Sequence, residues 1–86
     1  MSHFRSLLHV GLAYLKGEGV PQSDAEAAKW LQKAADQEET DAQERLGYLY
    51  ENGWGVPLDY ERAAKWYLSA AAAGHEEAKK QYRAIH

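Results

Sequence analysis

The residues best suited to metal chemistry are four histidines, but their spacing does not support a metal site. They are His3, His9, His75 and His86. No two of them are four residues apart, the spacing that places two metal ligands on one face of a helix. His75 precedes Glu76 and Glu77, and these carboxylates are better explained as favourable charges at the positive N-terminal end of a helix. We therefore expect no bound metal ion.

Two Gly-x-Gly elements are the other candidates for ligand chemistry. They are Gly17-Glu18-Gly19 and Gly53-Trp54-Gly55. Neither follows a strand-like segment, and without a strand such an element is weak evidence for a phosphate site. The chain has no cysteine to serve as a nucleophile or thiolate ligand. No carboxylate pair lies in an apolar setting that would separate two pKa values, and no nucleophile lies beside a base. The sequence predicts a non-catalytic protein that needs no cofactor.

Length and charge narrow the function further. Eighty-six residues allow one domain of modest stability. A net charge of −3, with the ten basic residues scattered, argues against nucleic-acid binding. No apolar run approaches the roughly 20 residues that span a bilayer. We expect a cytoplasmic protein, or a periplasmic one if a signal sequence precedes this chain.

The elements that must position these residues are two copies of one repeat. At an offset of 36 residues the chain matches itself, and the identical pairs are mostly glycine, alanine and aromatic residues. They include Gly11 with Gly47, Tyr14 with Tyr50, the run Gly17, Gly19, Val20 and Pro21 with Gly53, Gly55, Val56 and Pro57, and Ala27-Ala28-Lys29-Trp30 with Ala63-Ala64-Lys65-Trp66. Both Gly-x-Gly elements are thereby explained as turns inside a repeat.

Apolar spacing and turn residues predict an all-α fold of five helices, with two helices in each repeat. The expected helices are about Ser2–Lys16, Asp24–Gln37, Thr40–Asn52, Tyr60–Ala73 and Glu76–Ile85. They form one domain over residues 1–86, with repeat one at about 4–39, repeat two at about 40–75 and a C-terminal capping helix at about 76–85. Gly74 ends the fourth helix, whereas its counterpart is Glu38, so the second helix is expected to end less sharply.

The string L-G-x-x-Y-x-x-G-x-G-V, which begins at Leu46, resembles the Sel-one-like repeat. This family is a branch of the tetratricopeptide-repeat class, so the resemblance implies a right-handed α-solenoid. It also implies a non-catalytic adaptor that binds other proteins or peptides. A cysteine-rich secreted branch of the family exists, and the absence of cysteine argues against membership of that branch.

The resemblance places the first helix of each repeat along the inner, concave wall of the solenoid. The candidate partner-binding residues on this wall are Arg5, Leu8, Leu12, Leu15, Asp41, Glu44, Tyr48, Glu51 and Lys80. The groove they form is apolar at its N-terminal end and charged beyond it. Trp54 joins them as a candidate because it stands where the first repeat has Glu18; it is either packing across the adjacent helix or an exposed anchor.

The first helix carries a second apolar stripe whose purpose the sequence leaves open. The stripe consists of Phe4, Leu8, Leu12 and Leu15. A helix that is apolar nearly all round is normally buried on both sides. The stripe therefore covers a neighbouring repeat, closes a homodimer with a second copy, or forms the wall of the partner groove. A small inhibitor or immunity protein that blocks a toxin or enzyme is a further alternative.

Overall fold

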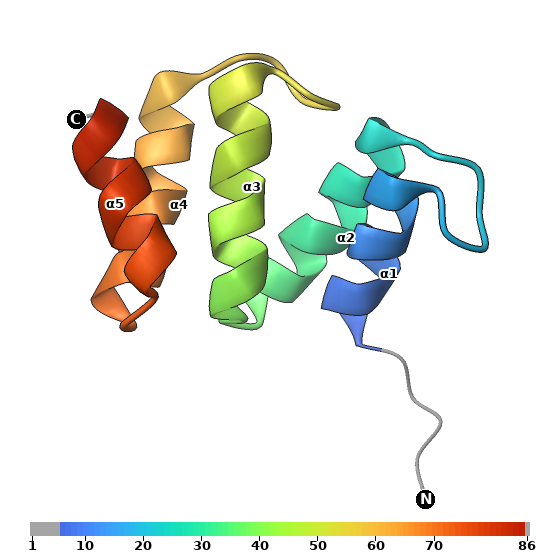
Figure 1. Ribbon diagram of the computed structural model, residues 1–86, viewed down its shortest axis with the longest axis horizontal. Coiled ribbons are helices and arrows are strands. Elements are labelled where there is room, and N and C mark those ends of the chain that lie inside the picture. The colour runs from blue at the N-terminus through green and yellow to red at the C-terminus, as the bar shows by residue number, and fades with distance from the viewer. Residues whose placement is uncertain (1–5, 86) are drawn as a thin grey trace, which may run out of the picture.

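The computed structural model describes residues 6–85, and these residues form five helices and no strand. The helices are α1 (Leu7–Lys16), α2 (Asp24–Asp36), α3 (Thr40–Asn52), α4 (Tyr60–Ala72) and α5 (Glu76–Ile85). Each repeat is a pair of helices joined by a Gly-x-Gly turn, and α5 follows the second pair (Figure 1). The expected all-α solenoid of two repeats and a terminal helix is confirmed.

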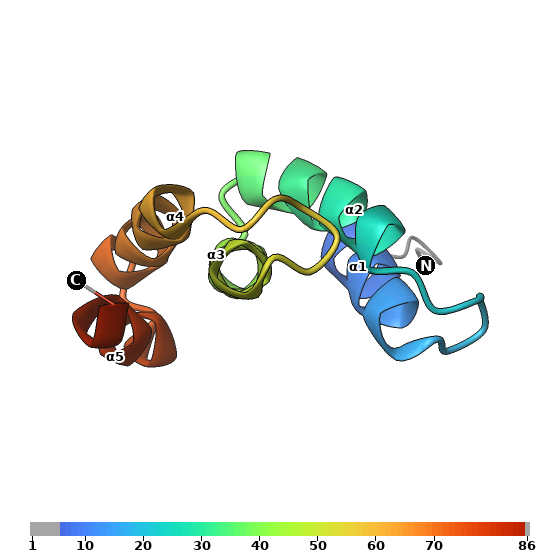
Figure 2. The same ribbon diagram turned by 90° about the horizontal axis from the view of Figure 1, so that it is seen from above.

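The helices form two layers that bend into an arch. Each helix packs mainly on its neighbours in the chain, as in other repeat proteins. Seen from above, α1, α3 and α5 lie on the inner side of the arch, and α2 and α4 lie on its outer side (Figure 2). The described chain measures 39 × 29 × 17 Å. The first helix of each repeat therefore faces the concave side.

The first helix begins later than the sequence suggested. Ser6 has an extended backbone, with ψ 154°, and its side chain accepts a hydrogen bond from the backbone N–H of His9. Ser6 is thus the N-cap, and the expected start at Ser2 is wrong because a capping residue is not itself helical. Residues 2–5 of the expected helix, Phe4 and Arg5 among them, lie outside the described residues. The ends of α2 and α4 fall one residue before the expected ones.

The turn after α2 also differs from expectation. Glu38 has φ 64°, and it is the one non-glycine residue with positive φ among residues 6–85. The backbone N–H of Glu39 donates to Ala34 O at 3.2 Å, as that of His75 donates to Ala70 O at 3.0 Å after α4. The turn around Glu38 is therefore the same left-handed helix end that Gly74 forms. The expectation of a less sharp end to α2 is wrong, because glutamate adopts the glycine conformation.

The core is built on close helix contacts that the repeat glycines permit. A Cβ atom on Gly47 would lie 2.8 Å from the ring of Tyr67, and one on Gly11 would lie 2.8 Å from Cγ of Leu31. Both partners, Tyr67 and Leu31, are fully buried. The small residues therefore let α2 approach α1 and α4 approach α3, which recovers the helix propensity lost at a glycine. The 36-residue register places Arg83 at the equivalent position of α5.

Candidate functional site

The middle of the inner wall holds an open depression where α3 meets α5. Its volume is about 460 Å³. It is lined by Asp41, Glu44, Arg45 and Tyr48 of α3 and by His75, Glu77 and Gln81 at or within α5. Three of the candidate residues from the sequence, Asp41, Glu44 and Tyr48, thus lie around one hollow. Lys80 is exposed on α5 but does not line it.

His75 joins the two walls of this depression. Its Nδ1 accepts a hydrogen bond from the backbone N–H of Ala78 at 3.2 Å, so it caps the start of α5. With Nδ1 acting as acceptor, the neutral ring carries its proton on Nε2, which lies 2.8 Å from Oδ1 of Asp41. Sequence reasoning tested His75 only as a metal ligand and missed this contact. Its position directly before Glu76 was the available signal, because a polar side chain is favoured there.

Metal binding has no support among residues 6–85. They contain no group of three or more histidine, aspartate or glutamate side chains that could hold an ion. The carboxylate of Asp41 in α3 and the ring of His75 at the start of α5 interact directly with each other. This pair is therefore a link between two helices of the inner layer.

Two exposed aromatic rings contact each other beside this depression: Tyr48, which lines it, and Trp54, in the turn that follows α3. Tyr48 is 41% exposed and Trp54 is 45% exposed. Their ring centroids lie 5.4 Å apart with an interplanar angle of 83°, an edge-to-face contact. Trp54 thus contacts an aromatic side chain of α3 while about half of its surface stays open to solvent. The sequence left open whether Trp54 packs on the adjacent helix or is exposed, and in the structure this side chain does both.

Glu51, another candidate residue of the inner wall, is held by a hydrogen bond to α4. The hydroxyl of Tyr67 donates a hydrogen bond to Oε1 of Glu51 at 2.6 Å. Burial of Tyr67, together with this bond to a carboxylate, raises the pKa of its phenol well above the ordinary value. Glu51 therefore serves the contact between α3 and α4.

The apolar stripe of α1 is divided between the core and the surface. Leu8 and Leu15 are half-buried and pack against the buried core. Leu12 instead lines a shallow depression of about 390 Å³ together with His9, Ala13, Lys16 and Glu18. Of the candidate residues on this helix that the structure describes, Leu12 is therefore the one that borders an open surface. Arg5 and Phe4 are not among the described residues.

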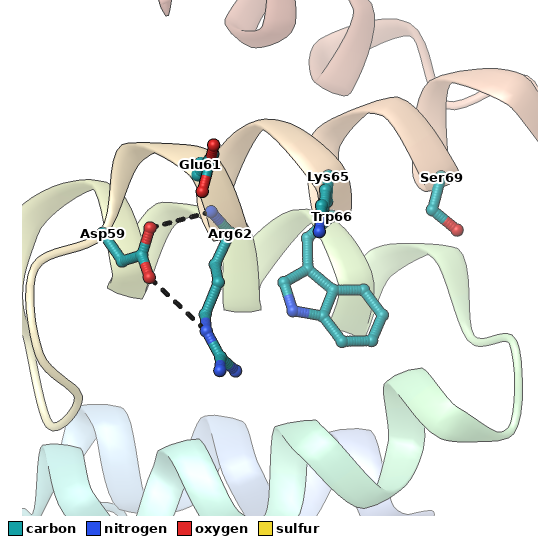
Figure 3. Close-up of a pocket in the computed structure, with 6 residues that line it drawn as sticks. All are labelled: Asp59, Glu61, Arg62, Lys65, Trp66 and Ser69. Atoms are coloured by element: carbon teal, nitrogen blue, oxygen red, sulfur yellow. Dashed lines mark hydrogen bonds and ion pairs between the residues drawn. The ribbon is translucent and has the colours of Figure 1, made fainter.

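A larger hollow lies on the outer side, beside α4. It has a volume of about 580 Å³ and is lined by Asp59, Glu61, Arg62, Lys65, Trp66 and Ser69. Figure 3 shows Arg62 and Trp66 pointing away from α4 toward the neighbouring α2, with Arg62 held by Asp59. Two of the side chains that line this hollow already serve the fold, since Trp66 packs against the core and Asp59 caps α4.

Comparisons with known proteins agree with this architecture. The Sel1 repeat model matches residues 5–39 and 40–75. The chain belongs to the Sel1 repeat family. Proteins built from Sel1 repeats are generally non-catalytic modules for protein–protein interaction. No curated protein matches this chain.

Solved structures of three bacterial proteins share the Sel1 fold of this chain. A Sel1 repeat protein from Oxalobacter formigenes is 44% identical with a TM-score of 0.91, over 93% of this chain and 23% of that one. The protective antigen c5321 of uropathogenic Escherichia coli, with an SLR fold, is 39% identical with a TM-score of 0.86, over 87% and 16%. Cysteine rich protein B of Helicobacter pylori is 28% identical with a TM-score of 0.82, over 86% and 56%. The chain thus spans less than a quarter of the first two.

Within residues 6–85, no helix is long and apolar enough to span a membrane.

Proposed function

We propose that this Sel1 repeat chain is a non-catalytic adaptor that binds a protein or peptide partner on the inner wall of the arch. The observation that carries this proposal is the exposed aromatic pair of Tyr48, which lines the α3–α5 depression, and Trp54, whose ring contacts it. Aromatic residues with open surface dominate the energetics of protein interfaces. Shared repeat positions such as Gly11, Gly47 and Tyr50 are buried in the packing of the helices, whereas the differing residues of the inner wall are available for recognition.

The charges around the depression indicate what kind of partner segment fits. Asp41, Glu44 and Glu77 bring three carboxylates to its lining, against the single guanidinium of Arg45. The nearest approach of Arg45 to a carboxylate is 3.9 Å, to Glu44. The wall therefore favours a partner segment with lysine or arginine near α5. Complementary charge of this kind speeds association and selects the partner.

An affinity-capture experiment with matched variants tests the proposal. Wild-type chain, Tyr48→Ala and Leu12→Glu are immobilised and exposed to the same cell lysate, and retained proteins are quantified by mass spectrometry. Lys29→Ala is the control, because Lys29 is exposed on α2 in the outer layer. We expect proteins held by wild type and by Lys29→Ala to fall by about tenfold with Tyr48→Ala, the loss for an anchor worth about 1.4 kcal/mol. Equal retention by all four chains would refute the use of this wall.

A homodimer closed by the α1 stripe is the second candidate. Leu12 supports it, since this leucine lies on an open surface beside the half-buried Leu8 and Leu15. Such a dimer is symmetric and therefore stops at two copies. Light scattering after size exclusion tests it: a dimer mass for wild type and a monomer mass for Leu12→Glu are expected. A monomer mass for wild type at high concentration would exclude it.

A further inference from the structure

Glu44 is a nearly buried carboxylate of the inner wall that receives no hydrogen bond from residues 6–85. Its side chain is only 12% exposed. The two other carboxylates that the sequence placed on this wall of α3 are both bound, Asp41 by the ring of His75 and Glu51 by the hydroxyl of Tyr67. A carboxylate with so little access to water normally has a partner that donates hydrogen bonds. Glu44 is therefore an acceptor that the described chain leaves open.

A second unpaired acceptor belongs to the same depression. Oε1 of Gln81 is buried and has no hydrogen-bond partner among the described residues. Gln81 lines the depression from α5, and Glu44 lines it from α3. The guanidinium-bearing side chain of Arg45 approaches Glu44 only to 3.9 Å, which is beyond hydrogen-bond distance. Two shielded acceptors on facing helices thus require donors from outside the described chain, because a buried acceptor without a donor is costly.

The rest of the lining narrows the chemistry of that donor. Tyr48 lines the depression, and its ring, which Trp54 contacts edge to face, is 41% exposed. Glu77 adds a second carboxylate, which is exposed. A group that fits must carry positive charge, several N–H donors and a flat face that stacks on an aromatic ring. The guanidinium of arginine combines these properties, and the depression, with a volume of about 460 Å³, has room for one long side chain.

We infer that the α3–α5 depression binds one arginine side chain of the partner segment, whose guanidinium donates to Glu44 and to Oε1 of Gln81 and lies against the ring of Tyr48. This inference rests on the proposed adaptor function and specifies its recognition element. Lysine fits less well, because its three donors share one strongly hydrated nitrogen and it has no flat face. The charge of Glu77 adds attraction for the incoming cation.

A titration with three small probes, followed by nuclear magnetic resonance, tests the inference. The probes are Nα-acetyl-arginine amide, the corresponding lysine amide and the corresponding citrulline amide, which keeps the shape of arginine without its charge. Each is added at low salt to about 50 mM, where a site with a Kd of about 5 mM is close to saturation. We expect the arginine probe to shift the backbone amide signals of Glu44, Tyr48 and Gln81 along saturable curves. The lysine probe should bind about threefold more weakly, and the citrulline probe about tenfold more weakly or not at all.

Three charge variants locate the binding. Glu44→Gln keeps the size of the side chain and removes its charge, so it should weaken the arginine probe by about tenfold. Arg45→Gln removes a competing cation and should strengthen binding by about two- to threefold. Glu61→Gln is the matched control, because Glu61 lines the hollow on the outer side beside α4, and it should leave the Kd unchanged. Circular dichroism verifies that each variant keeps its helices.

Several results would overturn the inference. These are the absence of saturable shifts with the arginine probe, equal binding of the lysine probe, and undiminished arginine binding by Glu44→Gln. Such a failure is distinguishable from failure of the adaptor proposal. If proteins captured from lysate still depended on Tyr48, the inner wall would remain the partner site without an arginine pocket. Equal capture by all the chains would instead refute the adaptor proposal itself.

Discussion

Replacing Glu38 with glycine is expected to stabilise the chain, because Glu38 holds a backbone conformation that suits glycine. Its φ of 64° is in the left-handed region. For residues with a Cβ atom this region costs roughly 1–2 kcal/mol, since Cβ approaches the following carbonyl oxygen. The hydrogen bonds of the turn are made by backbone atoms, so glycine retains them. Glu38→Gly removes the strain and leaves the turn intact.

The net gain is smaller than the strain, because glycine also makes the unfolded chain more flexible. That entropy opposes folding by about 0.4–1 kcal/mol. We therefore expect Glu38→Gly to raise the free energy of unfolding by about 0.5–1 kcal/mol. In a domain of this size the midpoint of thermal unfolding should rise by about 2–8 °C. Differential scanning calorimetry and urea unfolding both measure the effect.

Two further variants separate strain from charge. Glu38→Ala removes the same negative charge but keeps Cβ, so it should leave stability nearly unchanged. Gly74→Ala introduces a Cβ at the equivalent turn, where φ is 98° and nothing lies within 4 Å of the new atom. It should lower stability by about 1 kcal/mol through backbone strain alone. If Glu38→Ala stabilised the chain as much as Glu38→Gly, charge and not backbone strain would be the cause.

Three other outcomes follow from the close packing of α2 on α1 and of α4 on α3. Gly47→Ala should cost about 1–2 kcal/mol in urea unfolding, because the new Cβ would press on the buried Tyr67 ring; Gly11→Ala should cost a similar amount, because its Cβ would press equally closely on the buried Leu31 side chain. Tyr67→Phe should cost about 1.5–3 kcal/mol by leaving Glu51 without its phenol donor, and a loss under 0.5 kcal/mol would show that water replaces the hydroxyl. Above about pH 10 the unfolded chain releases the phenol proton of Tyr67, while the folded state, with its raised pKa, retains it. The contribution of Tyr67 to the free energy of unfolding should therefore fall by up to about 1.4 kcal/mol per pH unit; equal alkaline slopes for wild type and Tyr67→Phe would contradict this.

The five helices could be predicted from the sequence because the same residue types recur at the same helix–helix contacts in both repeats. Gly11 and Gly47 recur where a partner helix approaches closely, and Trp66 of the repeated tryptophans packs against the buried core. Asp59 precedes α4, and its side chain accepts a hydrogen bond from the backbone N–H of Arg62, as an aspartate at an N-cap commonly does. Helix number, helix type and the turns follow from such repeated local chemistry.

Three features could not be predicted, because they depend on how the helices pack in three dimensions and residue types do not specify that packing. Glu38 at the end of α2 holds the left-handed turn although a residue with a Cβ atom disfavours this region. The contact between His75 and Asp41 joins residues 34 apart in the chain, which no local pattern reveals. The division of the α1 stripe, with Leu12 on an open surface and Leu15 on the core, likewise depends on how α1 sits in the arch.

Site-specific photo-crosslinking tests the proposed adaptor function most directly. A photoreactive phenylalanine analogue replaces Tyr48 on the inner wall or, in the matched chain, Lys29 on the outer layer, and each chain is irradiated in cells. The proposal requires a discrete set of covalent adducts from position 48 that Trp54→Ala in the same chain weakens, and none of these adducts from position 29. The same adducts from position 29, or none from position 48, would contradict partner binding on the inner wall.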